Sequence, residues 1–244
     1  MPDDSGVIYV ATGASYRKDA ELSAQSLKLI HPDVRICLFS DAASDSGVFD
    51  VFVKVETPHA RSKISCMGMS PFRHTLFLDC DTRVVGPVLE PFALLERFDF
   101  AICLGKNRHP DKMAVKGYVT DDVPAAYYPY NSGVMYYRRS EATAQVFKDW
   151  AEAYHLTGSK LDQIPLRALL WKRPDISVYN LPGEFNAREL SLILATNDGL
   201  QLNRILHLPL FNTRWGKWRR IRKTLQKFQG PLRLTRRLFD VFSR

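Results

Sequence analysis

Residues 75–81 read Thr-Leu-Phe-Leu-Asp-Cys-Asp, four strand-forming residues followed by two carboxylates one residue apart. An apolar run of this kind that ends in an acidic turn is typical of a buried strand in a parallel sheet. Ligands of open α/β sheets bind where such strands end. We therefore expect Asp79 and Asp81 to lie at the ligand-binding edge of a sheet.

The residues around this stretch predict an α/β domain. Strands are expected at 7–12, 34–39, 49–55, 98–104, 133–137, 177–181 and 204–208, and helices at 20–30, 60–69, 91–97, 141–154 and 162–170. Alternating strands and helices predict a mostly parallel sheet flanked by helices. Residues 105–129 show neither the hydrophobic periodicity of a helix nor that of a strand, which is typical of a lid or an insert.

Composition predicts one domain, residues 1–216, followed by a basic tail, residues 217–244. The net charge of the chain is +8, but the tail alone holds ten Lys or Arg and one acidic residue. The body is therefore close to neutral, and its charge alone favours no polyanionic partner.

We expect neither a secretion signal nor a membrane-spanning segment in this sequence. Its first residues are acidic and polar, and no run approaches the ~20 apolar residues that a spanning helix needs. The four cysteines lie in apolar stretches without metal-type spacing: Cys37, Cys66, Cys80 and Cys103. We expect four free thiols and a cytoplasmic location.

Two carboxylates at a strand end can hold one hard cation, and that cation can bridge the oxygens of a diphosphate. Taken alone, the tripeptide is more often an exposed turn in which Asp81 caps residues 82–84. The motifs that follow it in the chain are therefore needed to support a metal site.

Residues 7–218 resemble the nucleotide-diphosphosugar glycosyltransferases of the GT-A fold, in particular the family 8 type that includes bacterial galactosyltransferases and glycogenin. The resemblance rests on motifs in the expected order: the acidic strand end at 75–84, Tyr-Asn-Ser-Gly-Val-Met-Tyr at 130–136, Leu-Asp-Gln at 161–163, Leu-Pro-Gly-Glu-Phe-Asn at 181–186 and Ile-Leu-His at 205–207. It implies transfer of a hexose from a nucleotide diphosphate sugar, with UDP as the expected carrier, to a glycan or glycolipid acceptor.

The same resemblance implies roles for individual residues. Metal ligands would be Asp79, Asp81 and His207. Residues around the donor sugar, with catalytic roles, would be Asn131, Asp162 and Gln163. Contacts to the donor nucleotide and diphosphate would come from Thr12, Tyr16, Lys63, Asp79, Asn186 and Arg214. An imidazole beside two carboxylates favours Mn²⁺, with Mg²⁺ as the second choice.

Several of these assignments have alternatives. Arg61 is the other candidate for the place of Lys63. The Lys-Pro-Trp that is usual in the family is Thr-Arg-Trp here, so either Arg214 replaces the diphosphate-binding Lys or that contact is missing. Asp162 is equally well explained as a helix N-cap, and His207 as a core histidine. The resemblance implies retention of anomeric configuration, whereas inversion would require a general base, for which Asp162 and Glu184 are the candidates.

The aromatic residues of 127–130 and 136–137 suit either a sugar acceptor or the core, and residues 105–126 are the candidate acceptor loop. In the tail, Trp218, Ile221, Leu225 and Phe228 repeat at helical spacing among basic residues. A helix of this kind suits the inner, anionic face of a membrane. Packing on the domain is the alternative, and nucleic acid is not an expected partner.

Two other function classes fit parts of the sequence. Residues 77–81 also resemble the nucleophile motif of haloacid-dehalogenase-type phosphatases, with Asp79 as nucleophile and Asp81 as acid and base. That motif calls for Thr or Val where this chain has Arg83. The other class is a non-catalytic module that binds membrane or nucleic acid through its tail.

Overall fold

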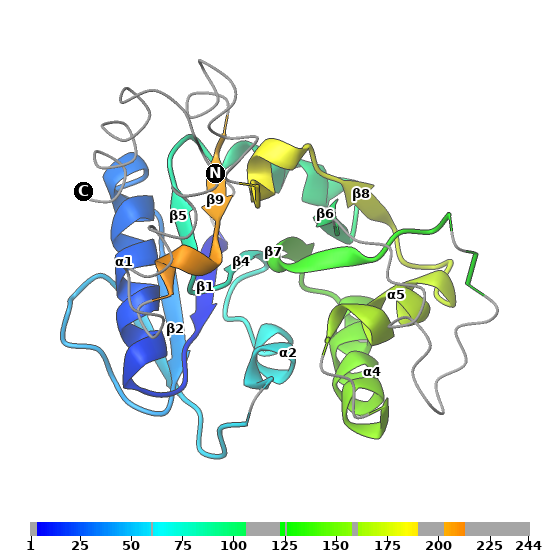
Figure 1. The fold of residues 1–244 in the computed structure, drawn as a ribbon, viewed down its shortest axis with the longest axis horizontal. Coiled ribbons are helices and arrows are strands. Elements are labelled where there is room, and N and C mark those ends of the chain that lie inside the picture. Colours follow the sequence, from blue (N-terminus) through cyan, green and yellow to red (C-terminus); the bar gives the residue numbers. More distant parts are fainter. Residues whose placement is uncertain are drawn as a thin grey trace, which may run out of the picture.

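The structure is a computed structural model that describes residues 4–59, 61–105, 123–124, 126–157, 161–189 and 203–212. Its centre is a seven-stranded sheet with helices packed on both faces (Figure 1). Across the sheet the strands are β3 (Val51–Lys54), β2 (Ile36–Ser40), β1 (Ser5–Val10), β4 (His74–Leu78), β7 (Tyr130–Arg138), β6 (Phe100–Leu104) and β8 (Val178–Asn180).

The sheet is mostly parallel, as the sequence predicts. Strands β3, β2, β1 and β4 run parallel to one another, and β8 runs parallel to β6. Strand β7 is antiparallel to both of its neighbours, β4 and β6. The beginning of β7 therefore lies beside the end of β4, where Leu78 pairs with Val134. This reversal brings residues 131–133 to the edge at which the acidic turn leaves the sheet.

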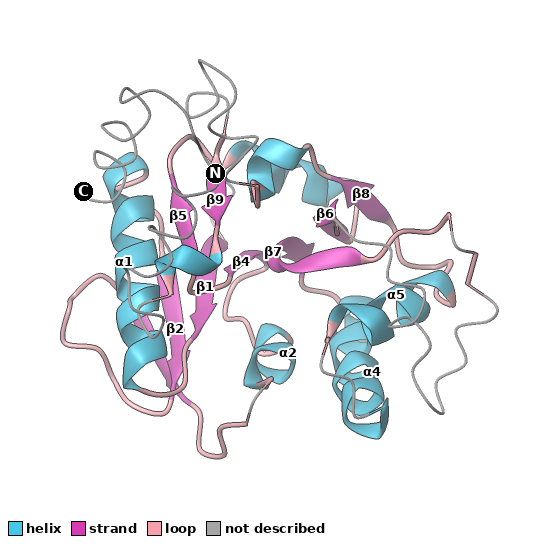
Figure 2. Cartoon of the chain, in the orientation of Figure 1, coloured by secondary structure: helices cyan, strands magenta, loops and turns pink. Residues whose placement is uncertain are grey.

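Each face of the sheet is covered by a different set of helices, which Figure 2 separates from the strands by colour. Helix α1 (Ala14–Ile30) covers one face with residues spaced by three or four: Asp19, Ala20, Ser23, Ala24 and Leu27 are buried. The other face is covered by α2 (Ser62–Met67), α4 (Glu141–Thr157) and α5 (Gln163–Trp171). A buried cluster of apolar side chains, among them Phe77, Phe100 and Trp150, fills the space beneath these three helices.

A small second sheet completes the fold. Strand β5 (Thr82–Val84) follows the acidic turn and pairs antiparallel with β9 (Ile205–His207). Beside β9 lie two 3-10 helices, η2 (Gly183–Asn186) and η3 (Pro209–Phe211). Because β5 and β9 are far apart in sequence, their pairing joins the two halves of the domain.

The structure differs from the predicted elements in several places, and the helix predicted at 20–30 begins six residues earlier, at Ala14. The helix predicted at 91–97 is a 3-10 helix, η1 (Glu90–Glu96), in which backbone N–H groups of Phe92 and Arg97 bond to carbonyls three residues earlier. The strand predicted at 133–137 begins three residues earlier, at Tyr130. Strand β5 was not predicted, because three residues are too few to display an alternating pattern.

All four cysteines are free thiols, as expected. Within the described residues no helix combines the length and the apolar character needed to cross a bilayer. The loop residues 106–122, Arg214 and the tail 217–244 lie outside the described residues, so the predictions that concern them stay predictions.

Candidate functional site

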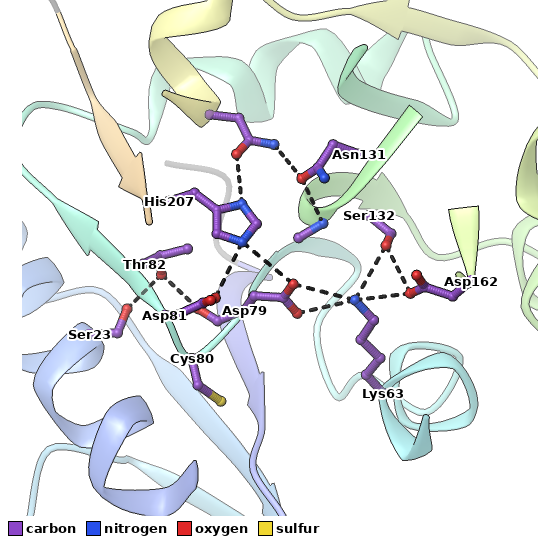
Figure 3. Close-up of polar contacts among 12 residues, drawn as sticks. Ser23, Lys63, Asp79, Cys80, Asp81, Thr82, Asn131, Ser132, Asp162 and His207 are labelled. Atoms are coloured by element: carbon purple, nitrogen blue, oxygen red, sulfur yellow. Dashed lines mark hydrogen bonds and ion pairs between the residues drawn. The ribbon is translucent and has the colours of Figure 1, made fainter. Parts of the chain in front are cut away.

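The acidic turn after β4 is fixed from beneath by hydroxyl groups. All five residues of β4 are buried, and the chain turns directly after Leu78. The Thr82 hydroxyl donates to the Asp79 carbonyl at 2.8 Å and lies 2.7 Å from the Ser23 hydroxyl of α1. The Tyr9 hydroxyl lies 3.0 Å from that of Ser23. This buried chain joins β1 and α1 to the backbone of the turn, and Figure 3 shows the part of it that runs from Ser23 through Thr82.

His207 reaches the turn through the β5–β9 pairing. Thr82 lies opposite His207 in the register, and the Leu208 N–H donates to the Asp81 carbonyl at 3.2 Å. The His207 Nε2 atom is 3.3 Å from Asp81 Oδ1 and 3.8 Å from Asp79 Oδ2. One ligand atom from each of these three residues lies within 4.8 Å of the others. The three predicted metal ligands thus converge.

Two asparagines orient His207. The Asn186 Oδ1 atom lies 2.9 Å from His207 Nδ1, and the Asn186 amide donates to Asn131 Oδ1 at 2.7 Å. Asn186 thereby presents an acceptor to Nδ1, which assigns the proton to that nitrogen and leaves the Nε2 lone pair facing the aspartates. All three side chains are buried. His207 is therefore held as a ligand would be, rather than packed as an apolar core residue.

Gly133 leaves the space in which the three ligands meet. A Cβ atom at this position would collide with the His207 ring and would lie 2.7 Å from Asp79 Oδ2. The Gly133 N–H donates to Asn131 Oδ1, and its carbonyl accepts from the Asp79 N–H. No role is predicted for Gly133 from the sequence, although a glycine inside a strand often marks the close approach of another group.

Lys63, from α2, lies between two carboxylates. Its ammonium is 3.2 Å from Asp79 Oδ1, 3.1 Å from Asp162 Oδ2 and 3.3 Å from the Ser132 hydroxyl. Burial lowers the pKa of Lys63, but the charges of Asp162 and Asp79 outweigh it, so that the pKa rises above its usual value. Lys63 is therefore a fixed positive charge at the acidic turn. Arg61, the other candidate, precedes α2 at its N-cap.

Asp162 stands at the N-cap of α5, but its side chain forms no capping hydrogen bond. It accepts instead from the Ser132 hydroxyl at 2.9 Å and pairs with Lys63. Burial alone would raise the pKa of Asp162, yet Lys63, Arg61 and Ser132 lower it overall. The N-cap explanation for this side chain is thus wrong. Ser132, which the sequence analysis did not assign, joins Asp162 to Lys63.

The three carboxylates of this cluster, Asp79, Asp81 and Asp162, differ in their partners. Lys63 pairs with Asp79 and Asp162, whereas Asp81 lies beside His207. Burial would raise the pKa of Asp81, but the hydrogen bond and charge of His207 and the charge of Lys63 lower it, so it stays ionised. Two carboxylates and one imidazole nitrogen directed at a common point form a donor set that suits a divalent cation.

The remaining described residues that the sequence analysis predicts for the site lie on α1, α5 and η2 and on the loop after β1. Thr12 and Tyr16 lie after β1 and in the first turn of α1, at the same edge of the sheet, and Tyr16 is 36% exposed. Gln163 is the first residue of α5. Glu184 is half-buried on η2.

Two of the predicted aromatic residues belong to the core. Tyr136 and Tyr137 are fully buried, and their hydroxyls donate to the carbonyls of Val88 and Met67. Tyr127 is half-buried and packs against the exposed Trp171, with ring centroids 5.1 Å apart. Tyr127 is therefore more exposed than Tyr136 and Tyr137, and an acceptor contact by the aromatic residues stays a prediction.

No protein-family model matches the sequence, and no curated protein matches it significantly. Solved structures do match. The galactosyltransferase LgtC, in complex with donor and acceptor sugar analogs, aligns over 93% of this chain and 97% of its own, with a TM-score of 0.56 and 15% identity. Mouse xyloside xylosyltransferase 1, in its apo form, aligns over 84% of this chain and 97% of its own, with a TM-score of 0.56 and 13% identity. The glycosyltransferase GlyE of Streptococcus pneumoniae TIGR4 aligns over 83% of this chain and 54% of its own, with a TM-score of 0.55 and 17% identity. The chain therefore has the GT-A fold that these glycosyltransferases share, and the expected fold class is confirmed.

Proposed function

We propose that this chain is a metal-dependent glycosyltransferase that moves a hexose from a nucleotide diphosphate sugar, with UDP as the carrier, to a glycan or glycolipid. The observation that carries the proposal is the convergence of Asp79, Asp81 and His207 at the carboxyl edge of the sheet. The shared GT-A fold supports it, because LgtC has that fold and was solved with donor and acceptor sugar analogs.

In this proposal Asp79, Asp81 and His207 hold the cation. The mixed oxygen and nitrogen donors favour Mn²⁺, with Mg²⁺ as the second choice. A bound divalent cation would neutralise the charge that develops on the nucleotide diphosphate as it leaves. The three side chains fit this role because Asn186 orients the imidazole and Gly133 leaves room between the ligands.

The remaining residues would bind and orient the donor. Lys63 would contact the diphosphate or the sugar, with Asp162 and Ser132 fixing its ammonium. Asn131 would use its amide nitrogen for the sugar, since its oxygen already accepts two hydrogen bonds. Gln163 would border the sugar with Asp162. Thr12 and Tyr16 would contact the base and ribose, and Arg214 the diphosphate.

The lowered pKa of Asp162 favours retention over inversion. A general base works best when its pKa lies near the working pH, and Lys63 holds this carboxylate in its charged, weakly basic form. We therefore assign Asp162 to positioning Lys63 and the sugar. Glu184 is left as the candidate base should inversion be observed.

The test is a thermal-shift screen of nucleotide sugars with and without Mn²⁺. A ligand present at about 100 times its Kd stabilises the native state by about 2.7 kcal/mol, so a donor should raise the melting temperature in Mn²⁺ and have little effect in excess chelator. Asp81→Asn is the matched control, and it should lose the metal-dependent shift while remaining folded. Equal shifts with and without Mn²⁺, or none with any nucleotide sugar, would contradict the proposal.

A phosphatase that uses Asp79 as its nucleophile is the weaker candidate. Asp79 is paired with Lys63 and directed toward the same point as His207 and Asp81, which suits a shared cation better than attack on phosphorus. Trapping of a phosphoaspartate at Asp79 would favour the phosphatase, whereas sugar transfer without such an adduct would exclude it.

We further propose that residues 1–216 form the transferase domain of a cytoplasmic protein and that residues 217–244 dock it on the inner face of an anionic membrane. The support is the basic composition of the tail and its apolar residues at helical spacing. Replacing Arg219, Arg220, Arg222 and Lys223 with Glu should abolish co-sedimentation with phosphatidylserine vesicles. Undiminished sedimentation of that variant would contradict docking through the tail.

A further inference from the structure

Arg188 is a cation near the acidic turn that the sequence analysis did not assign. It follows Ala187, which forms a parallel bridge with Leu206 next to His207. The Ala187 N–H donates to the Ile205 carbonyl at 2.8 Å, and the His207 N–H donates to the Ala187 carbonyl at 2.9 Å. The backbone that carries Arg188 is therefore fixed to the strand that carries a predicted metal ligand.

The register indicates where the side chain of Arg188 points. Opposed residues of paired strands present their side chains on the same face, and successive residues alternate. Since Ala187 is opposite Leu206, Arg188 follows on the face of His207, which is directed at Asp79 and Asp81. Burial lowers the pKa of Arg188 overall, and the charges of Asp79 and Asp81 act against that lowering, which indicates that both aspartates are near the guanidinium.

Arg188 lacks a direct partner among the residues that the structure describes. It is half-buried, and none of those residues forms a hydrogen bond or an ion pair with its guanidinium. A partly desolvated arginine without a counterion is unfavourable, because its lost hydration is not replaced. The carboxylates that attract it are the ones that converge with His207. A ligand anion at this site would supply the missing partner.

We propose that Arg188 binds the diphosphate of the nucleotide donor, in addition to Lys63 and Arg214. The inference rests on the proposed function. Lys63 approaches the turn from α2, whereas Arg188 approaches it from the segment beside β9. Two cations from different elements can fix the phosphates on two sides of the acidic turn. A guanidinium suits this task because its parallel N–H groups match two phosphate oxygens.

Inorganic pyrophosphate tests the inference, since it carries the diphosphate without a base or a sugar. Calorimetry would give the Kd of Mn²⁺ alone and the Kd of pyrophosphate at saturating Mn²⁺ for the wild type, Arg188→Ala and Arg188→Lys. We expect Arg188→Ala to raise the Kd of pyrophosphate about tenfold. The Kd of Mn²⁺ should stay equal or fall, because the variant lacks a cation near the metal ligands. Arg188→Lys should recover part of the loss.

Arg35→Ala is the matched control, since it removes one charge at the amino end of β2, where the guanidinium lies over the Phe72 ring. It should bind pyrophosphate as the wild type does. If Arg188→Ala fails to fold, Arg188→Gln replaces it, because it keeps part of the aliphatic stem and a polar end. Melting temperatures identify the folded variants.

Two results would overturn the role of Arg188. One is a Kd of pyrophosphate for Arg188→Ala that equals the wild-type value. The other is an equal loss of affinity for Mn²⁺ and for pyrophosphate, which would make Arg188 a structural support of the metal-ligand residues. In both cases the wild type still binds nucleotide sugars with Mn²⁺, so the proposed function stands. Failure of the wild type itself to bind pyrophosphate and every nucleotide sugar would instead refute the proposed function.

Discussion

The two ends of β7 each lie beside a buried carboxylate and a basic side chain, but the carboxylates at the two ends are partnered differently. At the carboxyl end, Arg138 donates to Asp99 Oδ1 at 2.7 Å, while the N–H and hydroxyl of Ser177 donate to Asp99 Oδ2 at 2.9 and 2.8 Å. At the amino end, residues 131–133 adjoin Asp79 and Asp162, which share Lys63, and Asp81, which lies beside His207.

This difference separates a structural cluster from a binding cluster. Both Asp99 and Asp162 are less than 10% exposed, so burial does not distinguish them. What distinguishes them is that Asp79 and Asp81, beside Asp162, converge with His207 on one point, which favours binding of a cation. Substitutions at the amino end of β7 should therefore change Mn²⁺ affinity, and substitutions at its carboxyl end should change stability alone.

The largest effect is expected from Gly133→Ala. The added methyl group would occupy the space next to His207 and Asp79 Oδ2, so at least one ligand must move. Mn²⁺ affinity, measured by calorimetry, should fall about 100-fold or more. Gly183→Ala is the control, because a Cβ atom there meets nothing within 4 Å. An unchanged Kd in Gly133→Ala would contradict the proposed arrangement of ligands.

A smaller loss is expected from Asn186→Ala. This change removes the acceptor at His207 Nδ1 and the donor to Asn131, which frees the imidazole to rotate. Loss of an orienting partner typically lowers metal affinity by about 10- to 100-fold. Asn180→Ala, at the exposed end of β8, should have no such effect. Equal Mn²⁺ affinity in the two variants would show that His207 does not need the contact with Asn186 to bind the cation.

Thr82→Val should have a still smaller effect. It removes the hydroxyl that bonds the Asp79 carbonyl and the Ser23 hydroxyl, so the turn loses its link to α1 while the ligands remain. We expect stability to fall by about 1 kcal/mol and Mn²⁺ affinity by a few-fold at most. Thr82→Ser should restore both, since it keeps the hydroxyl. If Thr82→Ser shows the same stability and Mn²⁺ affinity as Thr82→Val, the shape of the side chain rather than its hydrogen bonds fixes the turn.

Asp99→Asn should leave Mn²⁺ affinity unchanged and lower the free energy of unfolding by about 1–3 kcal/mol. Burial raises the pKa of Asp99, but Ser177 and Arg138 outweigh it and lower the pKa overall. A lowered pKa stabilises the fold above the unfolded-state value near 4, and this stabilisation is lost as the pH falls through the folded-state value. The difference between wild type and variant should thus be larger at pH 6 than at pH 3, measured by urea unfolding. An altered Mn²⁺ affinity would contradict the separation of the two ends of β7.

Much of the site could be inferred from local patterns. An apolar strand that ends in Asp-Cys-Asp indicates that the strand is buried and that the carboxylates emerge at the carboxyl edge of the sheet. Asn131, Asp162 and His207 were selected by type and order within a resemblance, and the structure brings all three to the same turn. The contribution of Ser132 could not be inferred, because a serine in a strand has no pattern that reveals its partner.

The sequence by itself determined the alternation of strands and helices, the acidic strand end and the candidate ligands, because these depend on periodicity and on residue type. Tertiary structure alone decided that β5 pairs with β9, that Asn186 orients His207 and that Arg188 approaches the same carboxylates. The physical reason is that these contacts join segments far apart in the chain. Which of them meet depends on strand register and on the reversal at β7, and no local pattern encodes either.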